Sequence, residues 1–327
     1  MASTYLTKNL STATDLKTWT WSAWIKRSKL STEQGLFSGD AASTYTTSFF
    51  FDTSDRLQYK DVSAGSTRQQ LITNRVFRDT SSWYNIQVVY NSTEGTASNR
   101  LKFYVNGSQE TSFSTATYPS LNETVQINGS DPTGIGKQPQ STSNNFDGSM
   151  AHVHFIDGLA YQASTFGETN AASGIWTPLA SPSVTYGTNG FFLKFGSSGA
   201  LGTDSSGNSN TFTVNGSGTQ TQDAPSNVFS TMNATSIYGS VTLANGNTQV
   251  NVADSTDNAT STFMASSGKW YWEGKYTVGA SGLAMVGIRP EGMNYNQQTL
   301  FNLTGTYQGY YYYGDNGNIR PANTSYG

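Results

Sequence analysis

The stretch that decides the fold runs from Ser82 to Phe113 and reads SWYNIQVVYNSTEGTASNRLKFYVNGSQETSF. Apolar side chains alternate in it with polar or opposite-facing ones, first at Tyr84, Ile86, Val88 and Tyr90 and then at Leu101, Phe103 and Val105. A period of two predicts strands with one buried face. Asn106 and Gly107 accept the positive φ angles that a two-residue hairpin loop requires. The stretch therefore predicts a β-meander that is buried on one side.

Similar runs lie on both sides of this meander. In WTWSAWIKRS, Trp19, Trp21, Ala23 and Ile25 fall on one face of a predicted strand, with Thr20, Ser22, Trp24 and Lys26 on the other. Further strands are predicted at residues 35–39, 48–52, 56–61, 124–130 and 131–137, and after residue 148 with Ala151, Val153 and Phe155 facing inward. Short strands separated by Ser, Thr, Gly and Asp turns are typical of a sandwich or barrel.

Composition narrows the fold class and the partners. Of the 327 residues, 12% are charged, 13% are aromatic and 33 are glycine. Abundant turn formers, with enough aromatic side chains for a core, favour an ordered all-β protein. A formal net charge of −3 gives no basic surface for nucleic acid or an anionic membrane. We expect no nucleic-acid binding and no membrane insertion, since no run approaches the roughly 20 apolar residues of a spanning helix.

The absence of cysteine from the sequence excludes disulfide bonds and thiolate-ligated metal sites. The first residues, MASTYLTKNLSTATDL, lack the apolar run of a secretory signal. We therefore expect a protein that is synthesised in a cytoplasm.

Two motifs resemble one known family. The central stretch follows WY-x-[IV]-x-V-V-Y … LK-[FL]-YVNG, and residues 146–161, FDGSMAHVHFIDGLAY, follow F-D-G-x-[IM]-x-x-[VI]-x-[IF]-[YD]-x-x-[AL]. Both patterns resemble the laminin-G-like, concanavalin A-like jelly rolls. The resemblance implies an antiparallel jelly-roll sandwich, which we assign to residues 1–218.

The end of this first domain carries a pattern that is out of place. Residues 191–216, FFLKFGSSGALGTDSSGNSNTFTVNG, resemble the stretch that usually opens such a domain, yet here they come last. We expect a circularly permuted jelly roll in which residues 190–214 join the sandwich formed by residues 1–160. Permutation is tolerated where chain ends lie close together at the surface.

A second domain is predicted after a polar linker at residues 219–233. The runs SSGKWYWEGK, at residues 266–275, and MVGI, at residues 285–288, resemble the SPRY family, another antiparallel sandwich used for binding. Trp270, Trp272 and Tyr276 are predicted to share one face of a strand. The match covers the first half of that fold, so residues 234–327 are predicted to be the N-terminal half of a SPRY-like sandwich, truncated at Gly327.

Candidate catalytic groups are few. Glycosidases with the concanavalin A-like fold carry carboxylates on one strand, commonly spaced E-x-D-x-x-E, because an acid and a nucleophile must flank one glycosidic bond. None of the seven glutamates takes that spacing: Glu33, Glu94, Glu110, Glu123, Glu168, Glu273 and Glu291. We therefore expect no enzymatic activity. His152 and His154 are predicted on one strand face, either as a pair of ligands or, the favoured interpretation, as surface or interface side chains.

Calcium is the cofactor that the sequence leaves open, because lectin-like sandwiches often hold it with loop oxygens. The candidate ligands are Asp204, Asn208 and Asn210 in DSSGNSN, together with Asp147 in FDG. The competing interpretation, that these residues form Asx turns without an ion, is favoured because Asp, Asn and Gly form such turns unaided.

Four aromatic residues are candidates for ligand binding. Tyr310 and Tyr312 belong to a tyrosine run that could stack on sugar rings. Trp24 and Trp83 lie on faces opposite the apolar sets of their strands. Each of these two indoles could contact a second sheet, a neighbouring subunit or a sugar.

The most specific resemblance covers residues 204–233, which match the connection D-S-S-G-N-x-N-x-F-T … D-A-P-x-N-x-[FY]-x-T-[ML]-N. Tandem modules joined in this way resemble structural proteins of bacteriophages, marine ones in particular. The resemblance implies a non-enzymatic tail-fibre or other virion appendage protein, localised to the virion. Its implied partners are other virion proteins, further copies of itself in a symmetric particle, and host-surface polysaccharide. Two alternatives stay open: a purely architectural capsid or tail decoration protein, and a polysaccharide depolymerase on the same jelly roll.

Overall fold

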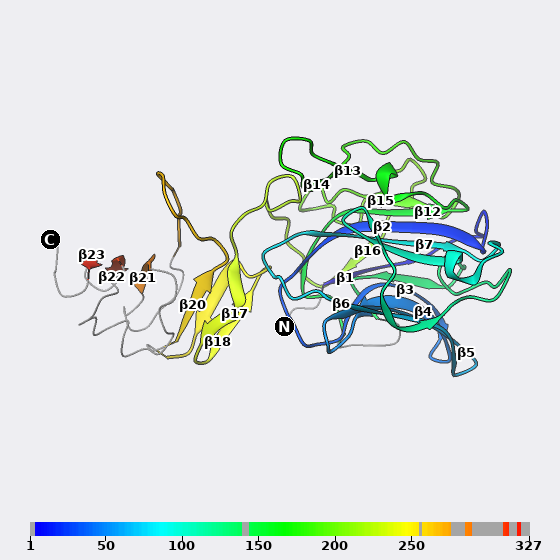
Figure 1. The fold of residues 1–327 in the computed structure, drawn as a ribbon, viewed down its shortest axis with the longest axis horizontal. Helices are drawn as coiled ribbons and strands as arrows, with labels where there is room; N and C mark the ends of the chain where they lie inside the picture. The colour runs from blue at the N-terminus through cyan, green and yellow to red at the C-terminus, as the bar shows by residue number, and fades with distance from the viewer. Residues whose placement is uncertain are drawn as a thin grey trace. The chain divides into compact units, whose positions relative to one another are not determined.

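The computed structural model describes residues 4–138, 144–254, 257–275, 285–289, 310–313 and 319–321. The chain divides into two compact units, Met1–Phe229 and Ser230–Gly327, and the boundary falls inside the predicted linker. Among the described residues, no helix is long and apolar enough to cross a membrane. The predicted all-β class with antiparallel sheets is confirmed (Figure 1).

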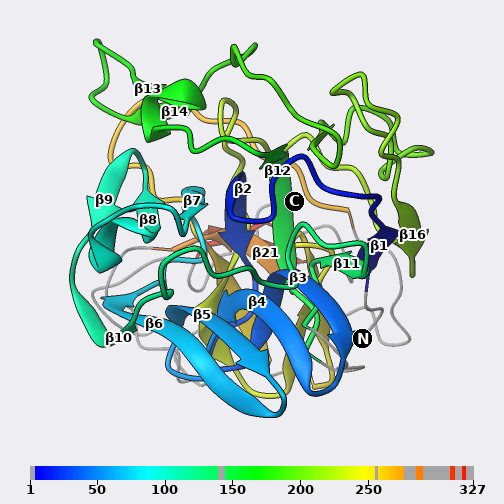
Figure 2. The same cartoon turned by 90° about the vertical axis from the view of Figure 1, so that its right-hand side faces the viewer.

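Two sheets packed face to face form the first unit (Figure 2). The eight-stranded sheet has the order β10-β6-β5-β4-β3-β11-β1-β16. Its strands are β1 (Tyr5–Asn9), β3 (Gln34–Ala42), β4 (Tyr45–Phe51), β5 (Arg56–Ser63), β6 (Ser66–Val76), β10 (Phe113–Thr117), β11 (Pro132–Ile135) and β16 (Thr213–Asn215).

The six-stranded sheet has the order β15-β12-β2-β7-β8-β9. Its strands are β2 (Thr18–Arg27), β7 (Tyr84–Asn91), β8 (Leu101–Val105), β9 (Ser108–Glu110), β12 (Gly148–Asp157) and β15 (Phe191–Leu193). The central strand β2 pairs with β7 on one side and with β12 on the other, and all ten of its residues are buried.

The meander predicted from the sequence is present as β7, β8 and β9. The one-turn helix η1 (Ala97–Asn99) interrupts it, and Val105 pairs with Ser108 across the predicted two-residue loop. Asn106 and Gly107 have φ angles of 48° and 80°, the left-handed values that this loop requires. The Asn-Gly pair thus adopts the backbone conformation that the local sequence predicts.

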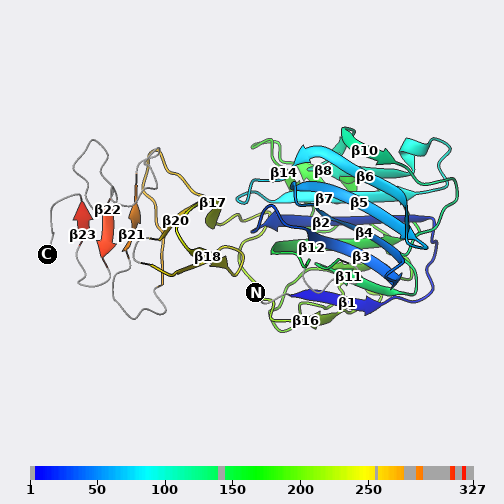
Figure 3. The ribbon, with the colours of Figure 1, turned by 90° about the horizontal axis from the view of Figure 1, so that it is seen from below.

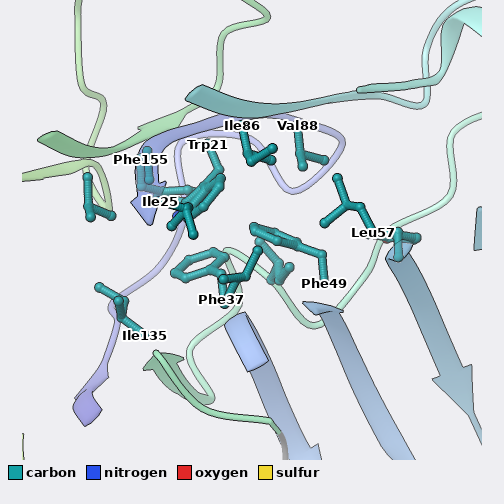
Figure 4. Close-up of a cluster of buried hydrophobic side chains, with 14 of the residues drawn as sticks. Trp21, Ile25, Phe37, Phe49, Leu57, Ile86, Val88, Ile135 and Phe155 are labelled. Atoms are coloured by element: carbon teal, nitrogen blue, oxygen red, sulfur yellow. The ribbon is translucent and has the colours of Figure 1, made fainter. Parts of the chain in front are cut away.

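An aromatic core fills the space between the two sheets, as Figure 4 shows. Trp21 from β2 packs edge-on against Phe49 from β4, with ring centroids 4.6 Å apart. Trp19 stacks on Tyr90 at 5.2 Å. Both edge-on and offset-stacked arrangements are favoured by the ring quadrupole, beyond the area that they bury.

The range 190–215 contributes two short strands, β15 and β16, to the same two sheets as residues 1–160. β15 pairs with β12 (Figure 1), and β16 pairs with β1 (Figure 3), so the two strands extend the edges of different sheets. The jelly-roll fold is confirmed, while the circular permutation and the boundary at residue 218 stay predictions.

The strand predicted at residues 124–130 is wrong. Val125 and Ile127 are buried in the core, as the pattern suggested, but the backbone there forms turns rather than a ladder. Asn128 has a φ of 72°, and its amide donates to Asp15 O and to Asp157 Oδ1. A left-handed residue held by buried side-chain hydrogen bonds ends any strand at this point.

The inward set predicted for β12 is partly wrong. Met150 pairs with the inward Ile25 and Ala151 with the outward Trp24, while a bulge places His152 and Val153 before His154 resumes the pairing. His152 has a φ of 48°. One extra residue reverses the facing of the strand, so Val153 and Phe155 face the core and Ala151 does not.

A strap, residues 158–190, crosses the outer face of the six-stranded sheet (Figure 1). It contains η2 (Ala163–Thr165) and the hairpin of β13 (Gly167–Thr169) and β14 (Trp176–Pro178). Trp176 packs against Val89, Tyr104 and Ala163, and its Nε1 donates to Asn85 Oδ1 at 3.3 Å. The outer face of this sheet is therefore covered rather than open to solvent.

The second unit holds small sheets. β17 (Met232–Tyr238) pairs with β20 (Asn258–Ser261), and β18 (Val241–Ala244) pairs with β19 (Gln249–Val252). β21 (Met285–Ile288), β22 (Tyr310–Tyr313) and β23 (Ile319–Pro321) form a three-stranded sheet. The strand predicted through Trp270 and Trp272 is wrong, because residues 269–275 belong to no strand, and Tyr276 lies outside the described residues. The SPRY-like assignment stays a prediction.

Candidate functional site

A pocket of about 270 Å³ opens at the edge of the sandwich where the last strands of the two sheets meet. We call it the edge pocket. It lies between β8 and β9 of the six-stranded sheet and β10 of the eight-stranded sheet, with η1 at its rim. Its lining is Ser98, Asn99, Leu101, Lys102, Gln109, Glu110, Thr111, Phe113 and Tyr118.

Aromatic rings form one side of the edge pocket. Phe113 begins the edge strand β10 and packs edge-on against the buried Phe103, with ring centroids 5.8 Å apart. Tyr118 is half-buried and also packs against the core. Both rings are thus held by the sandwich itself, so the pocket does not depend on a free loop for its aromatic wall.

Two charged side chains, Lys102 and Glu110, also line the edge pocket. Lys102 is half-buried on the face of β8 that points away from Leu101 and Phe103. Its ammonium forms no ion pair with any residue that the structure describes. Glu110 pairs with Arg75 Nε at 2.8 Å, and its other oxygen accepts the backbone N–H of Ser112. The negative charge of Glu110 is therefore compensated by Arg75, whereas the ammonium of Lys102 is available to a ligand.

This arrangement suits binding rather than cleavage of a glycan. Glu110 is the sole carboxylate in the lining of the edge pocket. Canonical glycoside hydrolysis needs two carboxyl groups on opposite sides of the bond, about 5–9.5 Å apart. An aromatic wall with a few polar groups can hold a sugar ring by its apolar face and its hydroxyls.

The loop predicted to bind calcium folds around its own carboxylate. Asp204 Oδ1 accepts the backbone N–H groups of Phe192 and Ser206, and Oδ2 accepts Ser206 Oγ and the Asn210 N–H, at 2.8–2.9 Å. Four donors occupy the lone-pair positions of this carboxylate. Asn208 and Asn210 both turn their amide nitrogens to the carbonyl oxygen of Gly190.

Asp147 does not join this loop. Asp204 forms a bridge with Leu193, whose partner on β12 is Val153, whereas Asp147 precedes the first residue of β12. Burial raises the pKa of Asp147, and the charge of Lys29 opposes that shift. As placed, the four predicted ligands do not present oxygens to one ion. Within the described ranges no group of three or more His, Asp or Glu side chains could hold a metal. The calcium site stays a prediction without geometric support.

The two predicted tryptophan platforms are covered. Trp24 is 3% exposed and Trp83 7% exposed. Trp83 Nε1 donates to Asp223 Oδ1 at 3.2 Å, so a later segment of the chain already occupies its polar edge. Neither indole offers the open ring face that a sugar needs, because less than a tenth of each residue is exposed.

The two predicted tyrosines belong to β22 in the second unit. Tyr312 is half exposed, whereas Tyr310 is placed only by its backbone, opposite Ile288 and Pro321. Tyr312 remains available to a ligand. A role of these tyrosines in binding stays a prediction.

The histidines are neither a ligand pair nor a surface pair. His154 is buried on the covered outer face of the six-stranded sheet, where it stacks on Phe192 with centroids 3.9 Å apart. Its Nδ1 lies 2.9 Å from the Tyr186 hydroxyl. Burial, with the neighbouring His152 and Lys194 as further causes, lowers the pKa of His154 to about 3. His154 is therefore neutral near pH 7 and has a packing role.

The sequence did not single out the residues of the edge pocket. Its aromatic residues, Phe113 and Tyr118, follow Lys102 by 11 and 16 positions, and they line one pocket with it only because the edge strands of two different sheets lie close together there. One signal was present: Lys102 is the one charged residue of β8, in a chain of which only 12% of the residues are charged.

Comparison with known proteins agrees with the fold. Residues 2–163 match the family model of the Concanavalin A-like lectin/glucanases superfamily. The first unit thus has a concanavalin A-like, laminin G-like jelly-roll fold, possessed by binding and catalytic proteins alike. No curated protein matches the chain.

Among solved structures, the chain is similar to a native heptameric SAP-like pentraxin from Limulus polyphemus, with 14% identity, 66% of this chain and 90% of that chain covered, and a TM-score of 0.39. It is also similar to domains LG4-5 of the mouse laminin alpha1 chain, with 12% identity, coverages of 50% and 44%, and a TM-score of 0.36. A third is domain 4 of AbnA, a GH43 extracellular arabinanase from Geobacillus stearothermophilus, in complex with arabinotriose, with 15% identity, coverages of 47% and 65%, and a TM-score of 0.34. We draw no functional conclusion from likenesses at this level.

Proposed function

We propose that this protein is a non-enzymatic glycan-binding protein whose edge pocket holds part of a polysaccharide. We further propose that it acts in a virion, as a tail-fibre or other appendage protein that contacts host-surface glycans. The observation that carries the binding role is the edge pocket, which combines fixed aromatic rings with an unpaired cation and a single neutralised carboxylate.

The polar groups of the edge pocket support this role. Asn99, Gln109 and Ser98 are exposed at its rim and can exchange hydrogen bonds with hydroxyl groups. Lys102 adds three donors on a flexible stem. A site with several such donors and acceptors around a ring face discriminates among sugars by leaving its polar groups unpaired when the wrong one binds.

The virion role is supported by the resemblance of residues 204–233 to connections between modules of phage structural proteins. In the structure this segment is ordered around two aspartates, Asp204 and Asp223, which the resemblance pattern shares. The motif thus has a physical reason, because each carboxylate fixes its own loop. The appendage role itself is proposed and is tested on particles.

The binding role is tested with the full chain on an array of bacterial envelope polysaccharides, followed by calorimetry with the best ligand. Lys102→Ala and Gln109→Ala should each weaken binding about fivefold to tenfold, which corresponds to a lost hydrogen bond of roughly 1 kcal/mol. Lys8→Ala is the matched control, because Lys8 lies on β1 near the other edge of the eight-stranded sheet. Equal affinity of all variants would move the site away from the edge pocket.

Two further results would reject the proposal. Release of reducing ends or unsaturated sugars from the bound polysaccharide by the purified chain would show an enzyme. Absence of the protein from purified particles of its source phage, measured by mass spectrometry, would reject the appendage role while leaving the binding role open to the first test.

A further inference from the structure

The segment that leaves the first unit is fastened to the sandwich by a buried ion pair. Asp223 Oδ2 lies 2.8 Å from Lys26 Nζ, and the two side chains are 6% and 3% exposed. Asp223 Oδ1 accepts from Trp83 Nε1. Lys26 stands at the end of β2 and Trp83 just before β7, so neighbouring strands of the six-stranded sheet provide both donors. We call Lys26 and Trp83 the socket.

The inserted segment has a fold of its own, and we call residues 223–229 the clamp segment. Ala224 and Asn227 exchange two backbone hydrogen bonds around Pro225 and Ser226. The Phe229 N–H donates to Asp223 Oδ1, and the Phe229 carbonyl accepts from Lys26 Nζ. The clamp segment is therefore a preformed turn that presents one carboxylate to the socket. This explains why D-A-P-x-N-x-F forms a recognisable motif.

The chain that leads to the clamp segment is exposed. After β16 ends at Asn215, residues 216, 217 and 219–222 are exposed, and Gly216 has a φ of 82°. Seven residues can span about 23 Å when extended. Once the Gln220 amide leaves the Phe195 carbonyl, to which it donates at 2.7 Å, the tether at residues 216–222 can carry the clamp segment away from its own socket while the sheets stay paired.

We propose that the socket also accepts the clamp segment of a second copy of this chain, so that two copies exchange clamp segments and form a closed dimer. Within one chain the clamp segment already fits the socket. The clamp segment of a second copy has the same carboxylate, the same turn and the same Phe229 carbonyl. Exchange of identical elements is reciprocal, and each copy donates one clamp segment and fills one socket. Every charge that is buried in the single chain stays paired in the dimer.

The experiment disables the clamp within each chain and restores it between chains. Lys26→Asp places two carboxylates together, and Asp223→Lys places two ammonium groups together, so each variant alone loses its internal pairing. Mixed in equal amounts, the two variants have complementary partners only across the dimer. We expect each variant alone to be monomeric and the mixture to give a heterodimer of twice the mass by size exclusion with light scattering.

The double variant K26D/D223K is the matched control, because it restores opposite charges within one chain and should show the same balance of monomer and dimer as the wild type at the same concentration. Digestion with proteinase K reports the clamp directly. Cleavage at residues 216–222 should be roughly tenfold faster in each single variant than in the wild type or the double variant, since a buried ion pair has been broken.

A second arm avoids reliance on the folding of K26D. The full chain with Asp223→Lys keeps Lys26 and Trp83, so a peptide of residues 219–230 should bind its vacated socket and quench Trp83 fluorescence. The same peptide with Asp223→Asn should bind at least roughly tenfold more weakly. A mixture that stays monomeric while both variants are folded by circular dichroism, together with no peptide binding, would overturn the proposal.

Discussion

The same sequence pattern, two tryptophans two residues apart, is buried in the first unit of this protein and exposed in the second. WTW at Trp19–Trp21 and WYW at Trp270–Trp272 both place indoles two residues apart. Trp19 and Trp21 are fully buried in β2, whereas Trp270 and Trp272 are 61% and 54% exposed outside any strand. β2 has a hydrogen-bonded neighbour on each side and a second sheet beneath it. Alternation therefore predicts a buried strand only where partner strands and a facing sheet exist.

The largest expected difference between the two regions concerns packing. Trp21→Ala removes a ring that contacts Phe37 and Phe49 and leaves a cavity in a close-packed core. We expect a loss of about 3–5 kcal/mol in the free energy of unfolding of the first unit, measured by urea denaturation. Trp272→Ala is the counterpart in the second unit. It should change the free energy of unfolding of the second unit by less than about 0.5 kcal/mol. Equal effects would mean that the two tryptophans share one environment.

The next prediction compares buried and exposed carboxylates. Asp55 lies between Arg27 and Arg78, at 3.0 Å from each. Burial opposes its ionisation, but the Ser31 N–H and the two guanidinium groups outweigh burial and lower the pKa of Asp55. Asp55→Asn leaves Arg27 uncompensated in the interior and should cost about 3–5 kcal/mol at neutral pH.

The sign of the pH dependence follows from the lowered pKa. The native state releases the Asp55 proton more readily than the unfolded state, so its stabilisation is present above the unfolded pKa near 4 and is lost as the pH falls below it. The difference between wild type and Asp55→Asn should therefore shrink below pH 4. Asp257→Asn in the second unit, whose carboxylate accepts backbone N–H groups of Ser240, Ala253 and Asp254, should have the smaller effect.

A third prediction uses the buried imidazole under the strap. The unfolded chain protonates His154 below pH 6.5, whereas the native state holds it neutral until about pH 3. Acid therefore favours the unfolded state by roughly 1.4 kcal/mol per pH unit in this window. In His154→Phe that contribution to the slope should vanish, measured by denaturation at stepped pH. Tyr186→Phe keeps the imidazole and should keep the slope; a wild-type slope in His154→Phe would show that His154 is not responsible.

The smallest expected effect concerns the solvent access of the tryptophans in the two units, and its measurement leaves both units folded. Acrylamide should quench the fluorescence of the exposed Trp270 and Trp272 and leave that of Trp19 and Trp21 almost unchanged. The double variant Trp270→Phe/Trp272→Phe should lose most of the readily quenched fraction. Trp19→Phe should lose none of it. A quenched fraction that persists in the double variant would place solvent access at another tryptophan.

The candidate site shows how far sequence reasoning reaches. Tandem alternation and the Asn106–Gly107 loop were enough to predict β7, β8 and β9. The edge pocket was not predicted, because Lys102, Phe113 and Tyr118 meet only where the last strands of two different sheets lie side by side. Asp204 was predicted as a loop-forming or ion-binding residue, and only the structure shows its oxygens filled by four donors of the chain.

By itself, the sequence determined what local chemistry controls: the period of two in the strands, the left-handed turn at Asn106 and Gly107, and the absence of thiol and paired-glutamate chemistry. Tertiary structure alone decided what depends on partners far along the chain. The bulge at His152 reverses the facing of β12, the strap covers the outer face, and Asp223 meets Lys26 across 197 positions. Side-chain periodicity is a property of neighbours in sequence, whereas burial, pairing of charges and the shape of a pocket are set by neighbours in space.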